Sequence, residues 1–275
     1  MRPQAQVSGH AGLGPSPLKL AHISDLHFGR ADHGVVEALV EHLNAFAPQL
    51  IVVTGDLTQR ARPGEFQAAS RFLARLAAPT LIVPGNHDIA PFFRPLTRLF
   101  RPRAAYQRWI AEQPQVVTQD VTAVGVDTVS AWRVKEGSLT SHQLARVERV
   151  LGQSPYGFKI VASHHPLVHP ERGVRTRHEA RLLTSLDAWQ VDLALSGHLH
   201  GSWSGSRTHR ERPLSTLFVE ASTATSDRLR GHPNAYNQLE VDAHHIDVRV
   251  CALQGERFWS SEPAQRYLRA FAMRK

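Results

Sequence analysis

Five short motifs, in chain order between residues 21 and 201, carry side chains that bind metal ions. They are Asp25-x-His27, Gly55-Asp56, Gly85-Asn86-His87-Asp88, Ser163-His164-His165 and Gly197-His198-x-His200. Mixed oxygen and nitrogen donors suit divalent Mn, Fe, Zn or Co, and soft sulfur ligands are missing from the motifs. Two such ions side by side can clamp a phosphoryl group and activate water. The motifs therefore predict metal-dependent hydrolysis of phosphoesters.

The spacing within the motifs lets their side chains converge. Alternate residues of an extended chain point the same way, so Asp25 and His27 can reach one ion, as can the two histidines of the last motif. Gly55 permits a sharp turn that aims the carboxylate of Asp56 outward. A carboxylate has two oxygens, so Asp56 can bridge two ions.

The motifs follow apolar segments that alternate with helical patterns. Residues 18–26, 50–53 and 80–83 are typical of strands, whereas residues 35–46 and 66–76 carry apolar side chains at helical spacing. This alternation predicts a mainly parallel sheet covered by helices. Ligands bind such sheets beyond the carboxyl ends of the strands, which is where the motifs stand.

A second half of the chain repeats this arrangement. Its strand patterns are at residues 121–126, 158–162 and 191–195, and its helical patterns are at residues 141–151 and 179–189. Beyond residue 201 the helical pattern stops, and we expect antiparallel strands at residues 214–220, 236–241 and 245–252. The sequence thus predicts an α/β protein with two sheets face to face and helices outside.

The ordered pattern D-x-H, G-D, G-N-H-D, H, G-H-x-H resembles the calcineurin-like metallophosphoesterase family over residues 18–250, with no motif substituted. The resemblance implies a four-layer α/β/β/α sandwich, in which two mixed sheets are flanked by helices, and a binuclear metal centre. It implies that the first ion is held by Asp25, His27, Asp56 and His200. It implies that the second ion is held by Asp56, Asn86, His164 and His198, with Asp56 as the bridge.

The same resemblance gives His87 and Asp88 a catalytic part. His87 is implied to stabilise or protonate the leaving oxygen, with Asp88 behind it. An alternative for Asp88 is a helix N-cap, because the residues after it could open a helix. Of the paired histidines, the resemblance makes His164 the ligand, and His165 is expected to pack against Pro166. The alternative is that His165 is itself a direct ligand.

The reaction expected from these ligands is attack by a metal-bridging hydroxide on a small anionic phosphoester. The leading interpretation is a phosphodiesterase acting on a cyclic nucleotide or a glycerophosphodiester. The alternatives are a nucleotide-lipid pyrophosphate hydrolase of the UDP-diacylglucosamine type, a nuclease and a phosphomonoesterase. The lack of an obvious aromatic stacking stripe disfavours the nuclease. A different class, the non-catalytic scaffold, is disfavoured by the intact ligand set and His87.

Substrate choice is expected to lie in basic segments near the motifs. Residues 91–114 follow Asp88 as a possible lid insert, with five arginines and no acid before Glu112. We expect Arg98, Arg101 and Arg103 to bind the anionic substrate. The alternative is an amphipathic insert whose arginines are solvated. Residues 171–181 and 207–212 either widen a positive funnel around the metals or are solvated loops.

Composition narrows the partners and the compartment. The chain has 275 residues and a formal net charge of +8, which indicates anionic partners. Nucleic acid and peripheral membrane contact are compatible with this charge, but nucleic acid is not favoured. A single cysteine, Cys251, excludes an intrachain disulfide and suits a reducing cytoplasm. It lies in an alternating run and is expected to be a buried strand residue.

The chain divides into three expected parts. Residues 1–17 read as a disordered leader, residues 18–253 as one metallophosphoesterase domain and residues 254–275 as a C-terminal tail. The tail mixes aromatic and basic residues, which leaves three alternatives: a terminal helix that covers the sheet, a dimer contact or contact with an acidic membrane. The oligomeric state stays open.

Overall fold

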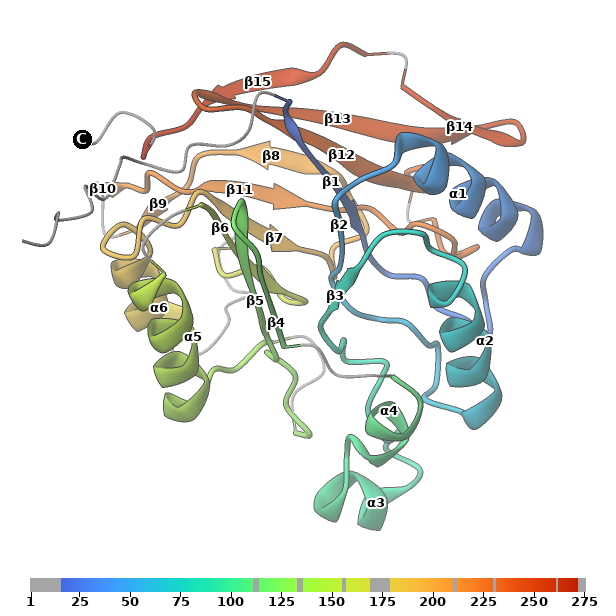
Figure 1. The fold of residues 1–275 in the computed structure, drawn as a ribbon. Helices are drawn as coiled ribbons and strands as arrows, with labels where there is room; N and C mark the ends of the chain where they lie inside the picture. The colour runs from blue at the N-terminus through green and yellow to red at the C-terminus, as the bar shows by residue number, and fades with distance from the viewer. Residues whose placement is uncertain are drawn as a thin grey trace, which may run out of the picture.

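Two β-sheets lie face to face in the computed structural model, with helices on their outer sides (Figure 1). The structure describes residues 16–110, 114–132, 136–154, 157–168, 179–209, 212–229, 231–260 and 262–271. The expected leader therefore lies almost wholly outside the described residues, as do residues 171–178 and 210–211 of the two basic segments.

The first sheet joins strands from both ends of the chain in the order β14-β13-β12-β1-β2-β3, with β15 also paired to β13. β1, β2 and β3 are parallel, and the other pairs are antiparallel. The strands are β1 (Leu18–Ile23), β2 (Leu50–Val53), β3 (Thr80–Ile82), β12 (Ala235–Val241), β13 (His245–Gln254), β14 (Arg257–Trp259) and β15 (Gln265–Leu268).

The second sheet has the order β4-β5-β6-β7-β11-β8. Its central strands β5, β6, β7 and β11 are parallel, whereas β4 and β8 are antiparallel edges. The strands are β4 (Gln115–Val117), β5 (Val121–Val126), β6 (Phe158–Ser163), β7 (Leu193–Ser196), β8 (Trp203–Gly205) and β11 (Leu217–Glu220). A separate ribbon pairs β9 (Thr208–His209) with β10 (Arg212–Pro213).

Strand alternation divides the core into layers. Leu50 and Val52 of β2 belong to the apolar cluster between the sheets, while Ile51 and Val53 belong to the cluster under the first pair of helices. A strand covered on both faces needs apolar residues at every position, which is why β2 is a continuous apolar run. A third cluster lies between the second sheet and its helices. The layers confirm the predicted four-layer α/β/β/α sandwich.

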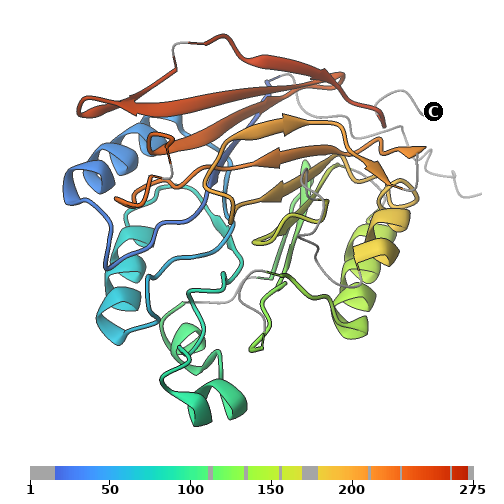
Figure 2. The ribbon, with the colours of Figure 1, turned by 180° about the vertical axis from the view of Figure 1, so that it is seen from behind.

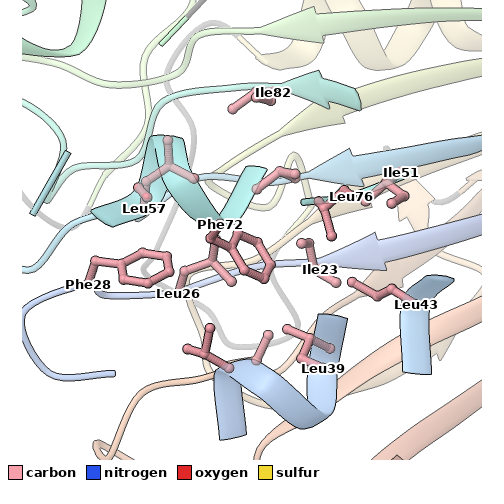
Figure 3. Close-up of a cluster of buried hydrophobic side chains, with 14 of the residues drawn as sticks. Ile23, Leu26, Phe28, Leu39, Leu43, Ile51, Leu57, Phe72, Leu76 and Ile82 are labelled. Atoms are coloured by element: carbon pink, nitrogen blue, oxygen red, sulfur yellow. The ribbon is translucent and has the colours of Figure 1, made fainter. Parts of the chain in front are cut away.

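Helices α1 (His33–Phe46) and α2 (Pro63–Leu73) cover the first sheet, and α5 (Ser141–Gln153) and α6 (Glu179–Leu186) cover the second (Figure 2). α1 begins where the Asp32 side chain accepts a hydrogen bond from the Val35 N–H at 3.0 Å, and it ends at Ala47, whose φ is 50°. Figure 3 shows its Leu39 and Leu43 against residues of β1 and β2.

Two short helices, α3 (Pro95–Phe100) and α4 (Ala104–Trp109), form a hairpin that projects from the body (Figures 1 and 2). Tyr106 of α4 is buried and meets the Phe66 ring edge-on, with centroids 6.3 Å apart. Phe93, Leu96 and Phe100 are between 67 and 73% exposed. The hairpin is therefore anchored through α4 and carries apolar side chains into solvent. Its role as a lid stays a prediction.

Two expectations need correction. A terminal helix in the tail is wrong, because residues 257–259 and 265–268 form β14 and β15 on the free edge of β13. An exclusively antiparallel third region is also wrong, because β11 runs parallel to β7. Strand direction depends on which partner a strand meets in space, and the alternation pattern is the same for both directions.

One smaller expectation, the burial of Cys251, is confirmed. Cys251 is 2% exposed on β13, and burial raises the pKa of its thiol to about 11. Among the described residues, no helix is long and apolar enough to cross a membrane.

Candidate metal centre

The five motifs meet because the strands before them end at one edge of the two sheets. The first proposed ligand of each motif follows the end of its strand by one to four residues, and the strands are β1, β2, β3, β6 and β7 in turn. Backbone hydrogen bonds continue past the strand ends, from Asp25 N–H to the Gly55 carbonyl at 3.0 Å and from His27 N–H to the Asp56 carbonyl at 2.9 Å. Backbone hydrogen bonds alone therefore hold the loop of Asp25 and His27 beside the loop of Asp56.

Most of the predicted ligand residues have a left-handed backbone conformation, which sets the direction of their side chains. Asp25, His27, Asp56, His198 and His200 have φ between 49° and 73°, a region that residues other than glycine seldom adopt. Such conformations persist only where the surroundings enforce them, and they concentrate at functional sites.

The motif glycines let the loops approach closely. A Cβ on Gly197 would lie 1.8 Å from Ser24 Oγ and 2.6 Å from Asp25 Oδ2. A Cβ on Gly85 would lie 2.2 Å from the backbone nitrogen of Asp56. Both approaches are possible only without a side chain, so these glycines set the distance between loops.

Asp25, His27 and His200 form one cluster of ligand atoms. His200 Nε2 lies 3.1 Å from Asp25 Oδ1 and 3.3 Å from His27 Nε2, and all three side chains are almost fully buried. Ser24 Oγ donates to Asp25 Oδ2 at 2.6 Å and thereby fixes the carboxylate. Asp25 Oδ1 is buried without a hydrogen-bond partner among the described residues. An unsatisfied buried carboxylate oxygen next to two imidazole nitrogens fits a cation.

Asn86, His164 and His198 form the neighbouring cluster. His164 Nε2 lies 3.0 Å from Asn86 Oδ1 and 3.3 Å from His198 Nδ1. On its other side, His164 Nδ1 donates to the Thr54 carbonyl at 2.7 Å, which fixes the tautomer and leaves Nε2 directed at the cluster.

Asp56 lies between the two clusters. Its Oδ2 is 3.7 Å from His27 Nε2 and 3.5 Å from His164 Nε2, while its Oδ1 accepts a hydrogen bond from the His87 N–H at 2.8 Å. The structure thus brings together all seven residues predicted as ligands, with Asp56 in the position expected of a bridge.

The charges of these side chains interact strongly. Burial disfavours imidazolium, but the carboxylates of Asp56 and Asp25 outweigh it and raise the pKa of His164 to about 9. Burial likewise opposes ionisation of Asp56, yet the neighbouring histidines hold its pKa well below the usual range. Without a cation, protons on imidazoles therefore balance the carboxylates. A metal ion would take over that balancing role and displace protons.

His165 is closer to the cluster than the sequence indicates. It is buried, its ring centroid is 4.6 Å from that of His198, and its Nδ1 is hydrogen-bonded to Thr128 Oγ1 at 2.8 Å. Burial and the neighbouring histidines lower its pKa, so the ring is neutral. One possible metal-binding group comprises His165 with His164 and His198. The partner Thr128, from the loop after β5, has no signal in the sequence.

His87 is half-buried at the edge of the first cluster. Its ring is perpendicular to that of His27, with centroids 5.0 Å apart, and its Nδ1 donates to the Gln59 carbonyl at 2.7 Å. The part played by Gln59 could not be predicted from the sequence, because a backbone acceptor leaves no trace in residue type. This hydrogen bond fixes the imidazole and leaves Nε2 for proton exchange.

The carboxylate of Asp88 is engaged with backbone. It is buried and accepts hydrogen bonds from the N–H groups of Leu57, Thr58 and Gly85 and from Thr58 Oγ1, at 2.8–3.0 Å. Burial and the charge of Asp56 raise its pKa to about 6. Asp88 therefore ties the loop of Asp56 to the loop of His87, and the helix N-cap alternative is excluded.

The arginines predicted to bind substrate have varied environments. Arg98 is 7% exposed and donates to the carbonyls of Ala131 and Ala90 at 2.6 and 2.5 Å. Arg103 pairs with Asp127 and donates to the Val129 carbonyl. These two side chains brace the α3–α4 hairpin against the loop after β5. Arg101 is exposed at the end of α3. Their role in substrate binding stays a prediction.

In the basic segment after His200, residues 207–212, Arg207 contacts other residues of the protein. Arg207 Nη2 lies 2.8 Å from Glu220 Oε1, and its guanidinium group lies 3.3 Å from the centroid of the Trp203 ring. Arg207 is thus fixed within the second sheet, so the described part of this segment does not support an open funnel.

Comparison with known proteins agrees with this geometry. Residues 18–202 match the model of the calcineurin-like phosphoesterase family. A Rhodopseudomonas palustris protein named probable cyclic nucleotide phosphodiesterase is 28% identical over 86% of this chain and 92% of its own length. An Enterobacter lignolyticus glycerophosphodiester phosphodiesterase is 31% identical over 54% of this chain and 57% of its own length.

Solved structures share the fold. The structure of PhoD has a TM-score of 0.66 at 12% identity, covering 94% of this chain and 69% of PhoD. The family implies divalent metal ions, which the histidine and aspartate clusters suit. The chain therefore belongs to the calcineurin-like phosphoesterase family.

Proposed function

We propose that this protein is a phosphodiesterase that hydrolyses a small anionic substrate with the help of two divalent ions, drawn from Mn, Fe, Zn and Co. The observation that carries the proposal is the position of Asp56, whose Oδ2 is within 3.7 Å of an imidazole nitrogen in each cluster. A carboxylate shared by two groups of ligands is what a pair of adjacent ions requires.

The proposed ligands divide between the two clusters. The first ion is held by Asp25, His27, Asp56 and His200, and the second by Asp56, Asn86, His164 and His198. Bound divalent ions supply charge that polarises a phosphoryl group and lowers the pKa of water. His165 is proposed to support His198 from behind, because Thr128 holds its ring in place.

The remaining chemistry belongs to His87. Its Nδ1 proton is committed to the Gln59 carbonyl, so Nε2 is the atom that exchanges a proton with the leaving oxygen. Asp88 is a positioning residue in this proposal, because its carboxylate fixes the loops that carry Asp56 and His87.

The names of the relatives support a cyclic nucleotide or a glycerophosphodiester as substrate. A second candidate, a nucleotide-lipid pyrophosphate, is favoured by the apolar side chains that residues 93–100, which include α3, expose after the motif carrying His87. Exposed Phe93, Leu96 and Phe100 would then contact acyl chains or a membrane surface. The cytoplasmic location inferred from cysteine content stays a prediction.

Hydrolysis of bis-p-nitrophenyl phosphate by the Mn²⁺-loaded protein tests the proposal. We expect turnover that exceeds turnover of the monoester p-nitrophenyl phosphate. Asp56→Asn should lose both metal and turnover, whereas His87→Ala should lower kcat by about 10²-fold with metal content unchanged. His142→Asn, at an exposed histidine on α5, serves as the matched control.

Two results contradict parts of the proposal. Undetectable diester hydrolysis by a fully metal-loaded protein refutes the phosphodiesterase. Full turnover by His87→Ala refutes the role of that imidazole alone. A panel of cyclic nucleotides, glycerophosphodiesters and nucleotide-lipid pyrophosphates then decides between the two substrate candidates.

A further inference from the structure

A cavity of about 540 Å³ lined by four arginines opens beside the metal centre. The arginines are Arg30, Arg60, Arg62 and Arg228, and within the described part of the chain Glu65 is the one acidic residue in the wall. They come from three loops that are far apart in the sequence. None of them belongs to the basic segments that the sequence analysis selected.

The cavity shares its loops with the metal centre. The Arg30 N–H donates to the His27 carbonyl at 2.8 Å, and the Arg228 carbonyl lies 3.3 Å from His200 Nδ1. Gln59, which also lines the cavity, holds the ring of His87. The cavity therefore borders the first metal cluster and the proposed proton donor.

Most of the positive charge in the cavity is available to a ligand. Among the described residues, Arg60, Arg62 and Arg228 make no ion pair, and all three are exposed. Arg30 pairs with Asp227 at 3.0 Å, where both side chains are more than half exposed. An exposed pair of this kind is weak and exchanges readily with another anion.

The carboxylate of Glu65 neutralises little of the positive charge of the arginine side chains, because it binds backbone groups. Its Oε2 accepts hydrogen bonds from the N–H groups of Arg60 and Arg62 at 2.8 and 3.2 Å. Its Oε1 packs against Gly29 so closely that a Cβ at that position would lie only 2.7 Å from this oxygen. The carboxylate is thus directed at backbone and shapes the loop that presents the two arginines.

We propose that this arginine cavity binds a second phosphate of the substrate, so that the protein prefers phosphodiesters that carry a further phosphate group. The proposal rests on the phosphodiesterase function proposed above. Guanidinium groups donate in a fork that matches phosphate oxygens, and several unpaired ones in one cavity suit a dianion better than a single negative charge. The metal centre then receives the diester while the cavity receives the second phosphate.

A pair of chromogenic substrates isolates this contact. Thymidine 5′-(p-nitrophenyl phosphate) and its 3′-phosphorylated analogue differ only in the second phosphate, and both release p-nitrophenolate. We expect kcat/KM to be at least about tenfold higher for the phosphorylated substrate. In Arg60→Gln/Arg62→Gln this ratio should fall close to one. Arg71→Gln removes one positive charge from the far end of α2 and should keep the wild-type ratio.

A binding measurement makes the result independent of turnover. Titration calorimetry with thymidine 3′,5′-bisphosphate should give a Kd at least about tenfold weaker for Arg60→Gln/Arg62→Gln than for wild type or Arg71→Gln. Thermal unfolding confirms that the variants are folded, which is expected because the arginines are exposed.

The outcomes separate the two proposals. Equal kcat/KM for both substrates in wild type, or a preference that survives in Arg60→Gln/Arg62→Gln, overturns the second-phosphate site and leaves the phosphodiesterase intact. If wild type cleaves neither substrate, the phosphodiesterase fails, and calorimetry alone decides the cavity. Bisphosphate binding that the double variant does not weaken overturns the cavity proposal.

Discussion

Removal of the metal ions should make the stability of this protein fall as pH rises above neutrality, because of His164. The pKa of His164 is raised to about 9, from an ordinary value of 6.5, by the carboxylates around it. A group whose pKa is raised on folding contributes stability that is fully present below its unfolded pKa and lost as pH rises through its folded pKa. The side chain is fully buried, so solvent does not screen this contribution.

The size of the effect follows from the difference in pKa. Each unit corresponds to 1.36 kcal/mol, so the contribution of His164 to the free energy of unfolding should fall by about 1.5 kcal/mol between about pH 7.5 and pH 9.0. His27 and the Cys251 thiol, whose pKa values are also raised, add smaller losses of the same sign. These smaller losses of stability also occur in a variant that lacks only the His164 imidazole. They therefore cancel when wild type is compared with that variant.

Urea unfolding in EDTA at the two pH values is the assay. The difference between wild type and His164→Asn isolates His164, and His142→Asn, at an exposed histidine, should behave as wild type. The reasoning also requires that metal binding at neutral pH release protons, with affinity rising about tenfold per pH unit for each proton displaced. Wild-type stability that does not fall, or that falls equally in His164→Asn, would refute this account.

Three further predictions concern packing and buried charge. Gly197→Ala should abolish metal binding, measured by metal analysis of the purified protein, because its Cβ would lie 1.8 Å from Ser24 Oγ. Phe66→Ala should lower the free energy of unfolding by about 3–5 kcal/mol, measured in urea, because the side chain is fully buried. Arg269→Met should cost about 3 kcal/mol by the same assay, because it leaves Asp192 buried and unpaired, and adding Asp192→Asn should restore most of the loss.

The sequence predicted the layers and the candidate ligand residues because both depend on local patterns. Continuous apolar runs such as residues 50–53 identify strands covered on both faces, and helical spacing in residues 35–46 identifies α1. Motifs that follow such strands must meet at one edge of the sheets. Asp25, Asp56 and His164 are therefore expected to lie within reach of one another, as the structure shows.

Features that depend on contacts between distant segments could not be predicted from such local patterns. The tail pairs with β13 as β14 and β15, because an open sheet edge offers hydrogen bonds that a strand can satisfy. The helical interpretation of the tail used only its own composition. The sequence likewise carries no sign that the structure buries Arg98 against the carbonyls of Ala90 and Ala131.

By itself, the sequence determined which atoms could hold metal ions, because donor chemistry is a property of residue type. Only the tertiary structure decided which positive charges stand beside those atoms. Arg30, Arg60 and Arg228 come from separate loops and line one cavity, while Arg98 and Arg103 serve as braces. Residue type decides whether a side chain can bind a metal ion. Whether an arginine is free to bind a ligand depends on which acceptors the fold brings within its reach.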